Sequence, residues 1–153
     1  MNDKLKRLLR VVLVYIVVVA ITLVMNGFYE KHRTQEYIDE FKELKGHHLL
    51  NEISDTYKIT IEQYSNYKLN REMKRKLVER LNKLSGDLRK VDHQINAQDV
   101  RYHIDFSFIY HDIKLVNIAL SDATKDDIVP VIVLHSMEGL GELKKEITYI
   151  QYR

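Results

Sequence analysis

An uncharged apolar run near the N-terminus is the strongest hydrophobic pattern in the chain. It covers residues 11–25, and apolar residues on both sides lengthen it to 8–29. The hydrocarbon core of a bilayer is about 30 Å thick and needs roughly 20 apolar residues in a helix. The run has no polar stripe, which a soluble core helix would show, and it exceeds the usual length of a strand. It therefore predicts a transmembrane helix over 8–29, after a short basic cytoplasmic tail at 1–7.

Two alternatives to an uncleaved anchor remain open. A cleaved signal peptide has the same basic start and apolar middle, although residues 24–28 lack the small residues of a cleavage site. A soluble core helix is the other. Four Lys and Arg residues precede the run and two follow it closely, which favours a cytoplasmic N-terminus. We therefore expect a single-pass protein of the cell membrane whose domain, 30–153, lies outside. A cytoplasm-facing domain is the alternative orientation.

Helical spacing predicts two helices in the domain. In residues 30–46 the apolar side chains recur every three or four positions, Thr34 is a candidate N-cap and Gly46 a candidate C-terminal glycine. This helix either continues the membrane helix or is hinged from it at Asn26-Gly27. Residues 70–85 form the clearest soluble helix, with leucines at intervals of three and four and Asn70 as its cap.

Alternating and continuous apolar patterns predict strands in the rest of the domain. Residues 47–56 fit either a short helix or a loop. The expected strands are 57–64, 100–110, 113–120, 128–134 and 146–152, with turns at His111-Asp112 and at 138–142. The resulting fold class is α+β: an antiparallel sheet of about four to five strands packed on two helices, in one domain.

The absence of cysteine narrows the class of protein. The chain has no Cys, which excludes disulfides and thiolate metal sites. Small secreted eukaryotic domains are usually held by disulfides. The composition therefore favours a bacterial membrane protein.

Positive charge is concentrated in the predicted helix after residue 68. Between Lys68 and Lys90 nine basic residues face three acidic ones, although the whole chain is only +2. Such a concentration produces a local field that attracts anions. The candidate partner-binding residues, which we call the basic surface, are Lys74, Arg75, Lys76, Arg80 and Lys83. A lysine-rich solvated face is the alternative, and the lack of interleaved aromatic residues argues against nucleic acid as the partner.

Histidines and tyrosines supply weaker candidates. His103 and Asp105, two positions apart on a predicted strand, with His111 in the following turn, could form a metal or acid–base site, or simply a polar sheet face. No catalytic motif accompanies them, and we predict no cofactor and no catalytic residue. Of ten tyrosines, we expect partial exposure at Tyr64, Tyr67, Tyr149 and Tyr152. Exposed tyrosines favour interfaces, and core-edge packing is the alternative.

These patterns define no reaction. They predict a non-enzymatic binding or assembly module, anchored in the bilayer, that contacts a protein or an anionic envelope component. A secretion, conjugation or envelope complex would use such a module, and self-association is compatible with it. The alternatives are a small membrane-tethered enzyme, metal-dependent or acid–base, and a cytoplasm-facing regulatory domain.

Overall fold

The computed structural model describes residues 3–66, 69–98, 100 and 103–152. Within them the elements are α1 (Asp3–Glu43), α2 (Gly46–Ser65), α3 (Arg71–Ile95), α4 (Ser107–Ser121), the 3-10 helix η1 (Ala123–Ile128) and α5 (Val129–Tyr152). These residues contain no strand. The predicted α+β fold, with its antiparallel sheet of four to five strands, is therefore wrong, and the domain is a helical bundle.

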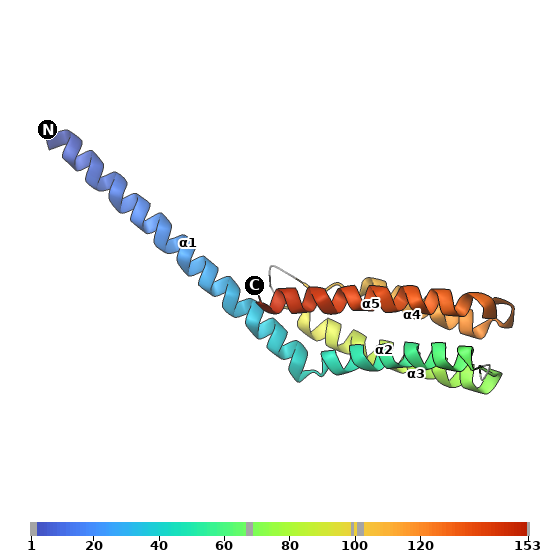
Figure 1. Ribbon diagram of the computed structural model, residues 1–153. Coiled ribbons are helices and arrows are strands. Elements are labelled where there is room, and N and C mark those ends of the chain that lie inside the picture. The colour runs from blue at the N-terminus through green and yellow to red at the C-terminus, as the bar shows by residue number, and fades with distance from the viewer. Residues whose placement is uncertain (1–2, 67–68, 99, 101–102, 153) are drawn as a thin grey trace.

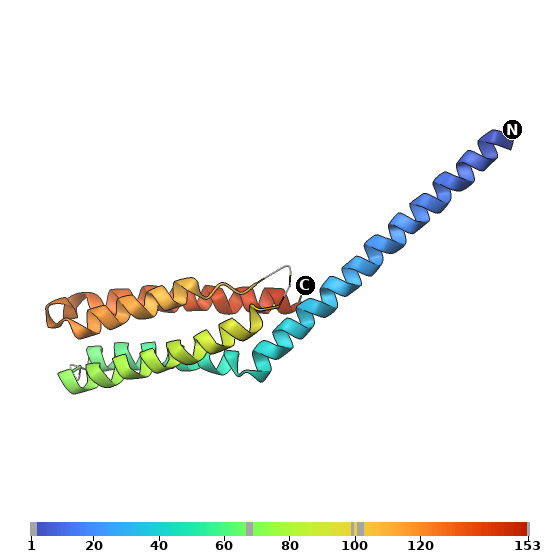
Figure 2. The same ribbon diagram turned by 180° about the vertical axis from the view of Figure 1, so that it is seen from behind.

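Helices α2 to α5 form an antiparallel bundle, and α1 lies across one of its ends (Figure 1). Helices α2 and α4 each pack against both α3 and α5. Within the described residues α3 and α5 do not contact each other, so they occupy diagonal corners. The N-terminal part of α1 projects from the bundle, and no other helix of the described chain lies beside it. The C-terminal end of α5 lies beside α1 in both views (Figure 2).

Helix α1 is continuous from the apolar segment, residues 8–29, into the part that packs on the bundle. No break occurs at Asn26-Gly27. Thr34 is not an N-cap, because it lies within the helix and its Oγ1 donates a hydrogen bond to the carbonyl oxygen of Glu30 at 2.9 Å. The apolar residues at helical spacing, Tyr37, Ile38 and Phe41, are fully buried.

A tight corner joins α1 to α2. Lys45 has a φ of 59°, in the left-handed region that turns a chain sharply after a helix. Gly46 does not end the first helix as predicted; it begins α2. A Cβ at Gly46 would clash with the ring of Phe41. Glycine is therefore required here so that the second helix can start directly against the first.

Helix α3 confirms the clearest helix prediction. The Asn70 side chain accepts a hydrogen bond from the Met73 N–H at 2.9 Å, as a cap should. The helix continues beyond 85 to Ile95, and Gly86 lies inside it with open space around it. The repeating apolar residues are buried: Leu77, Leu81, Leu84, Leu88, Val91 and Ile95.

The predicted strands 57–64, 113–120 and most of 100–110 lie in helices or irregular chain. Residues 47–65 continue α2, whose buried residues follow a helical period: Gly46, Leu50, Ile53, Thr56, Tyr57 and Thr60. His111-Asp112 is no turn, because both residues lie in α4. Residues 103–106 are irregular, and Arg101 and Tyr102 lie outside the described residues. Short alternating runs were misleading because positions i and i+4 share a face in both a strand and a helix.

The predicted strands 128–134 and 146–152, and the turn 138–142, belong to η1 and α5. Pro130 is the second residue of α5, where its missing N–H costs no intrahelical hydrogen bond. Gly139 lies inside the helix, and a Cβ there would be 3.3 Å from both the Asp112 carboxylate and the Phe108 ring. This glycine allows α4 to approach closely. The buried residues alternate at intervals of four and three: Val129, Val133, Ser136, Leu140, Leu143, Ile147 and Ile150.

Candidate functional site

The apolar segment, residues 8–29, makes no buried contact with the bundle. Every residue in it is exposed, including large apolar side chains such as Phe28 at 72%. The helix that contains it is long and apolar enough to cross a membrane. A soluble core helix would be mostly buried, so this alternative loses its support. A membrane anchor and a signal sequence both have the observed properties.

The basic surface is only partly available for a partner. Lys74 is half-buried and pairs with Asp126 from η1. Arg75 lies 3.6 Å from Glu79, and Lys76 lies 2.7 Å from Glu72 on the same helix. The last pair lowers the pKa of the Glu72 carboxyl below its usual value, through the Lys76 hydrogen bond and charge.

Arg80 and Lys83 are exposed and form no ion pair with any described residue. They lie on α3, at the corner diagonal to α5. Of the five predicted residues, these two have the charge most readily available to an anionic group in solution. Lys68, which contributed to the charge count, lies outside the described residues.

His103, Asp105 and His111 have separate roles in the structure. His103 lies before α4, with its Nδ1 at 3.1 Å from the Asn96 Oδ1. Asp105 accepts a hydrogen bond from the Ser107 N–H at 2.8 Å, and hydrogen bonds from Ser107 lower the pKa of its carboxyl. His111 is exposed on α4, and its Nδ1 lies 3.9 Å from Asp112 Oδ1. No group of three or more potential ligands that could hold a metal ion occurs in the described part of the chain.

A hydrogen-bond network that sequence reasoning missed fixes α1 to the end of the bundle. Tyr37 donates to Asn96 Oδ1 and accepts from the Ile104 N–H, both at 2.8 Å. Asn96 in turn donates to Asp92, whose second carboxylate oxygen accepts from the Tyr110 hydroxyl at 2.9 Å. Burial raises the pKa of Tyr37 to about 12. Because the network joins α1, α3, α4 and the loop between the last two, the end of α1 has one fixed direction relative to the bundle.

A second polar cluster lies inside the bundle. Asp112 is only 7% exposed and lies at the close approach of α4 to α5. Burial raises the pKa of Tyr57 on α2, and the Asp112 carboxylate acts in the same direction. Ser136 on α5 is buried and donates to the Ile132 carbonyl oxygen at 2.9 Å. The sequence signal was available: Asp112 falls on the apolar stripe of a helical reading of 109–120.

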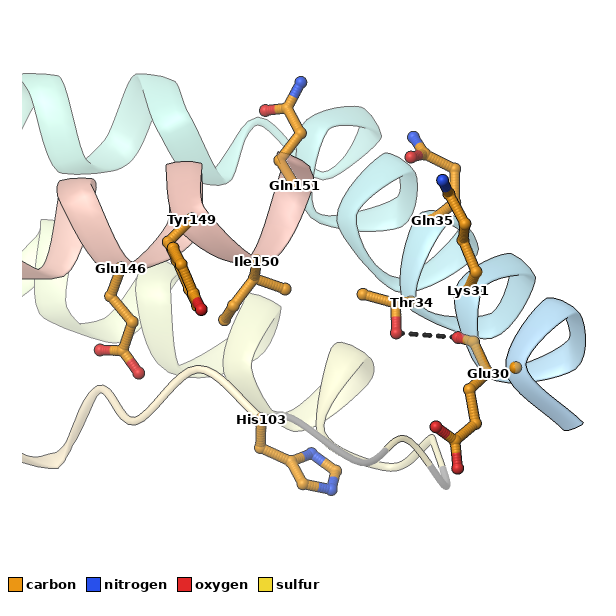
Figure 3. A pocket seen from close by; sticks show the side chains of 10 residues that line it. Glu30, Lys31, Thr34, Gln35, His103, Glu146, Tyr149, Ile150 and Gln151 are labelled. Carbon is orange, nitrogen blue, oxygen red and sulfur yellow. Dashed lines mark hydrogen bonds between the residues drawn. The ribbon is translucent and has the colours of Figure 1, made fainter. Parts of the chain in front are cut away.

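A cleft of about 550 Å³ opens between α1 and the C-terminal part of α5 (Figure 3). We call it the α1–α5 cleft, and Thr34 and Ile150 point toward each other across it. Its other described lining residues are mainly polar: Gly27, Glu30, Lys31, Gln35, His103, Glu146, Tyr149 and Gln151. Lining residues from α1 and α5 are more than 100 positions apart, so no local pattern could predict the cleft.

Two of the four tyrosines expected to be exposed lie at or near this cleft. Tyr149 is 62% exposed and Tyr152 is 80% exposed, which confirms the prediction for both. Tyr64, at the opposite end of the bundle, is half-buried, which agrees with the partial exposure predicted for it, and Tyr67 lies outside the described residues.

Comparison of the chain with protein-family models, with curated proteins and with solved structures finds no match.

Proposed function

We propose that this protein is a single-pass, membrane-anchored binding or assembly module whose helical bundle presents the basic surface of α3 to a protein or anionic envelope partner. One observation carries the proposal. A single helix, α1, is bare and apolar over residues 8–29 and is buried in the bundle at Tyr37, Ile38 and Phe41. Such a helix places a folded domain at a fixed position next to a bilayer.

The orientation in this proposal follows the charge flanking the segment. Four basic residues precede its uncharged core, residues 11–25, and only Lys31 and Arg33 follow closely. The N-terminus is then cytoplasmic and the bundle extracytoplasmic, according to the positive-inside rule. On that side the bundle meets envelope components and other membrane proteins, and not nucleic acid.

The energetics of exposed ion pairs support α3 as the binding surface. Exposed ion pairs along a helix contribute little to stability, because water and salt screen them. The pairs of Arg75 and Lys76 with neighbouring acids therefore present a small barrier to an incoming anionic partner. Arg80 and Lys83, which form no ion pair with a described residue, add two more exposed cations to α3.

Charge reversal of Arg80 and Lys83 tests the partner-binding part of the proposal. The double variant Arg80→Glu, Lys83→Glu should lose most of the partner that co-purifies with the tagged full chain from its own membranes. The matched control, Lys58→Glu with Lys145→Glu, makes the same charge change on α2 and α5 and should retain the partner. Equal recovery with both double variants would refute α3 as the binding surface.

A further inference from the structure

The C-terminal end of α5 lies level with the end of the apolar segment. The α1–α5 cleft is formed by Gly27, Glu30, Lys31, Thr34 and Gln35 on one side and by Glu146 to Gln151 on the other. Both ribbon views show the C-terminus beside α1 (Figure 1, Figure 2). The last turns of α5 therefore lie beside the part of α1 that follows residue 27.

The dimensions of a bilayer place this level in the headgroup layer. The layer adds about 5–7 Å on each side of the hydrocarbon core. At a rise of 1.5 Å per residue this corresponds to roughly four residues of helix beyond the hydrocarbon boundary. If the boundary is at Tyr29, the layer reaches about Arg33. The α1 wall of the cleft, from Gly27 to Gln35, crosses that layer.

The side chains at the end of α5 suit this environment. Tyr149 and Tyr152 are exposed, and both lie near the C-terminus of the helix. Tyrosine is enriched at membrane interfaces because its ring is apolar and its hydroxyl remains hydrated. On α1, Phe28 and Tyr29 supply two more exposed aromatic rings at the same level. Exposed aromatic side chains from two different helices therefore flank the α1–α5 cleft.

We propose that the last turn of α5 is a second contact with the bilayer, with Tyr149 and Tyr152 in the headgroup layer and the α1–α5 cleft open to the headgroups. This inference rests on the proposed function, in which residues 8–29 span the membrane. The first contact fixes the bundle's position, and the second fixes its tilt. Because α3 is diagonal to α5, its basic surface then lies on the side of the bundle away from this contact.

The absence of tryptophan makes a direct test practical, because each introduced Trp is the only one in the chain. Three full-length variants are compared: Tyr15→Trp inside the apolar segment, Tyr152→Trp at the end of α5, and Val131→Trp near the other end of α5. All three positions are exposed, so the substitutions leave the core intact. Each variant is reconstituted in phosphatidylcholine vesicles brominated near the top of the acyl chains, and Trp quenching is measured.

We expect strong quenching in Tyr15→Trp, intermediate quenching with a blue-shifted emission in Tyr152→Trp, and none in Val131→Trp. Quenching of Tyr15→Trp alone would overturn the second contact and leave the anchor in place. Equal quenching of Tyr152→Trp and Val131→Trp would also overturn it, because the contact would then not be confined to the end of α5. No quenching of Tyr15→Trp would overturn the proposed anchor itself.

Discussion

The two parts of α1 show how the same helix can require two different surroundings. From residue 8 to 29 it is predominantly apolar, and every residue is exposed. From Thr34 to Glu43 it is apolar on one side only, and Tyr37, Ile38 and Phe41 on that side are fully buried. The bundle buries the apolar side chains of the second part and leaves those of the first part exposed.

The two parts of α1 differ in the free energy that they gain from burying apolar side chains in the bundle. Burying one large apolar side chain away from water stabilises the folded state by about 1.5–3 kcal/mol. The second part of α1 obtains this stabilisation from α2, α3 and α5. The first part carries many such side chains without a protein partner among the described residues, and a bilayer would provide the missing burial.

The largest difference in stability should be that between Phe41→Ala and Phe28→Ala. Phe41→Ala removes a fully buried ring and should lower the free energy of unfolding by about 3–5 kcal/mol. Phe28→Ala changes a ring that is 72% exposed and should alter it by less than about 0.5 kcal/mol. Urea unfolding of both full-length variants in detergent micelles measures the difference. Similar destabilisation by the two variants would contradict the separation of α1 into a packed and a bare part.

A charge should be tolerated on the bundle and not in the apolar segment. Arginine at the centre of a membrane helix costs about 2.5–3.5 kcal/mol on insertion scales. Val18→Arg should therefore reduce the fraction of protein that remains with membranes after alkaline extraction. Val131→Arg makes the same change at an exposed valine of α5 and should leave that fraction unchanged. Equal extraction of the two variants would argue against a spanning segment.

Alkaline pH should weaken the attachment of α1 to the bundle. Burial raises the pKa of Tyr37 to about 12, with the Ile104 N–H opposing and the Asp92 charge reinforcing the shift. Below pH 10 the hydroxyl is protonated in both states. Between pH 10 and 12 the unfolded chain releases this proton and the folded chain keeps it, so stability should fall, by about 2 kcal/mol at most. Unfolding measured at about pH 9 and pH 11.5 should show a smaller decrease in Tyr37→Phe than in the native chain; an identical decrease would exclude this tyrosine as the cause.

The Tyr37 hydroxyl should matter at neutral pH as well. Tyr37→Phe removes the acceptor of the Ile104 N–H, and it leaves Asn96 Oδ1 with His103 Nδ1 but without the Tyr37 hydroxyl. The expected loss of stability is about 1–3 kcal/mol. The control, Tyr152→Phe, removes a hydroxyl from a side chain that is 80% exposed and should be nearly neutral. Thermal unfolding distinguishes the two, and a neutral Tyr37→Phe would show that the network contributes little.

Long patterns in the sequence predicted the structure well, and short ones did not. The apolar run of α1 and the leucine repeat of α3 extend over several helical turns, so only one periodicity fits them. Residues 57–64 and 146–152 are too short for that, because an alternating pattern over seven or eight residues shares positions with a helical one. In α5 the polar Ser136 and the glycines at 139 and 141 interrupted a repeat that otherwise continues to Ile150.

The candidate site was predictable only where it depends on composition. The excess of basic residues on α3 is visible in the sequence, but the pairing of Lys74 with Asp126 joins residues 52 positions apart. Tyr37 and Asn96, 59 positions apart, are likewise brought together by the arrangement of whole helices. Such contacts follow from the bundle topology, which the strand predictions had misassigned.

Single-cysteine labelling tests the central claim, that residues 8–29 span a membrane and hold the bundle on its outer side. The chain has no cysteine, so Lys6→Cys, Ala20→Cys and His111→Cys each provide one thiol at a position exposed in the structure. A membrane-impermeant maleimide is added to intact cells, to permeabilised cells and to detergent-solubilised protein. We predict labelling of His111→Cys on intact cells, of Lys6→Cys only after permeabilisation, and of Ala20→Cys only in detergent. Labelling of Ala20→Cys in intact membranes, or of Lys6→Cys and His111→Cys from the same side, would contradict the account.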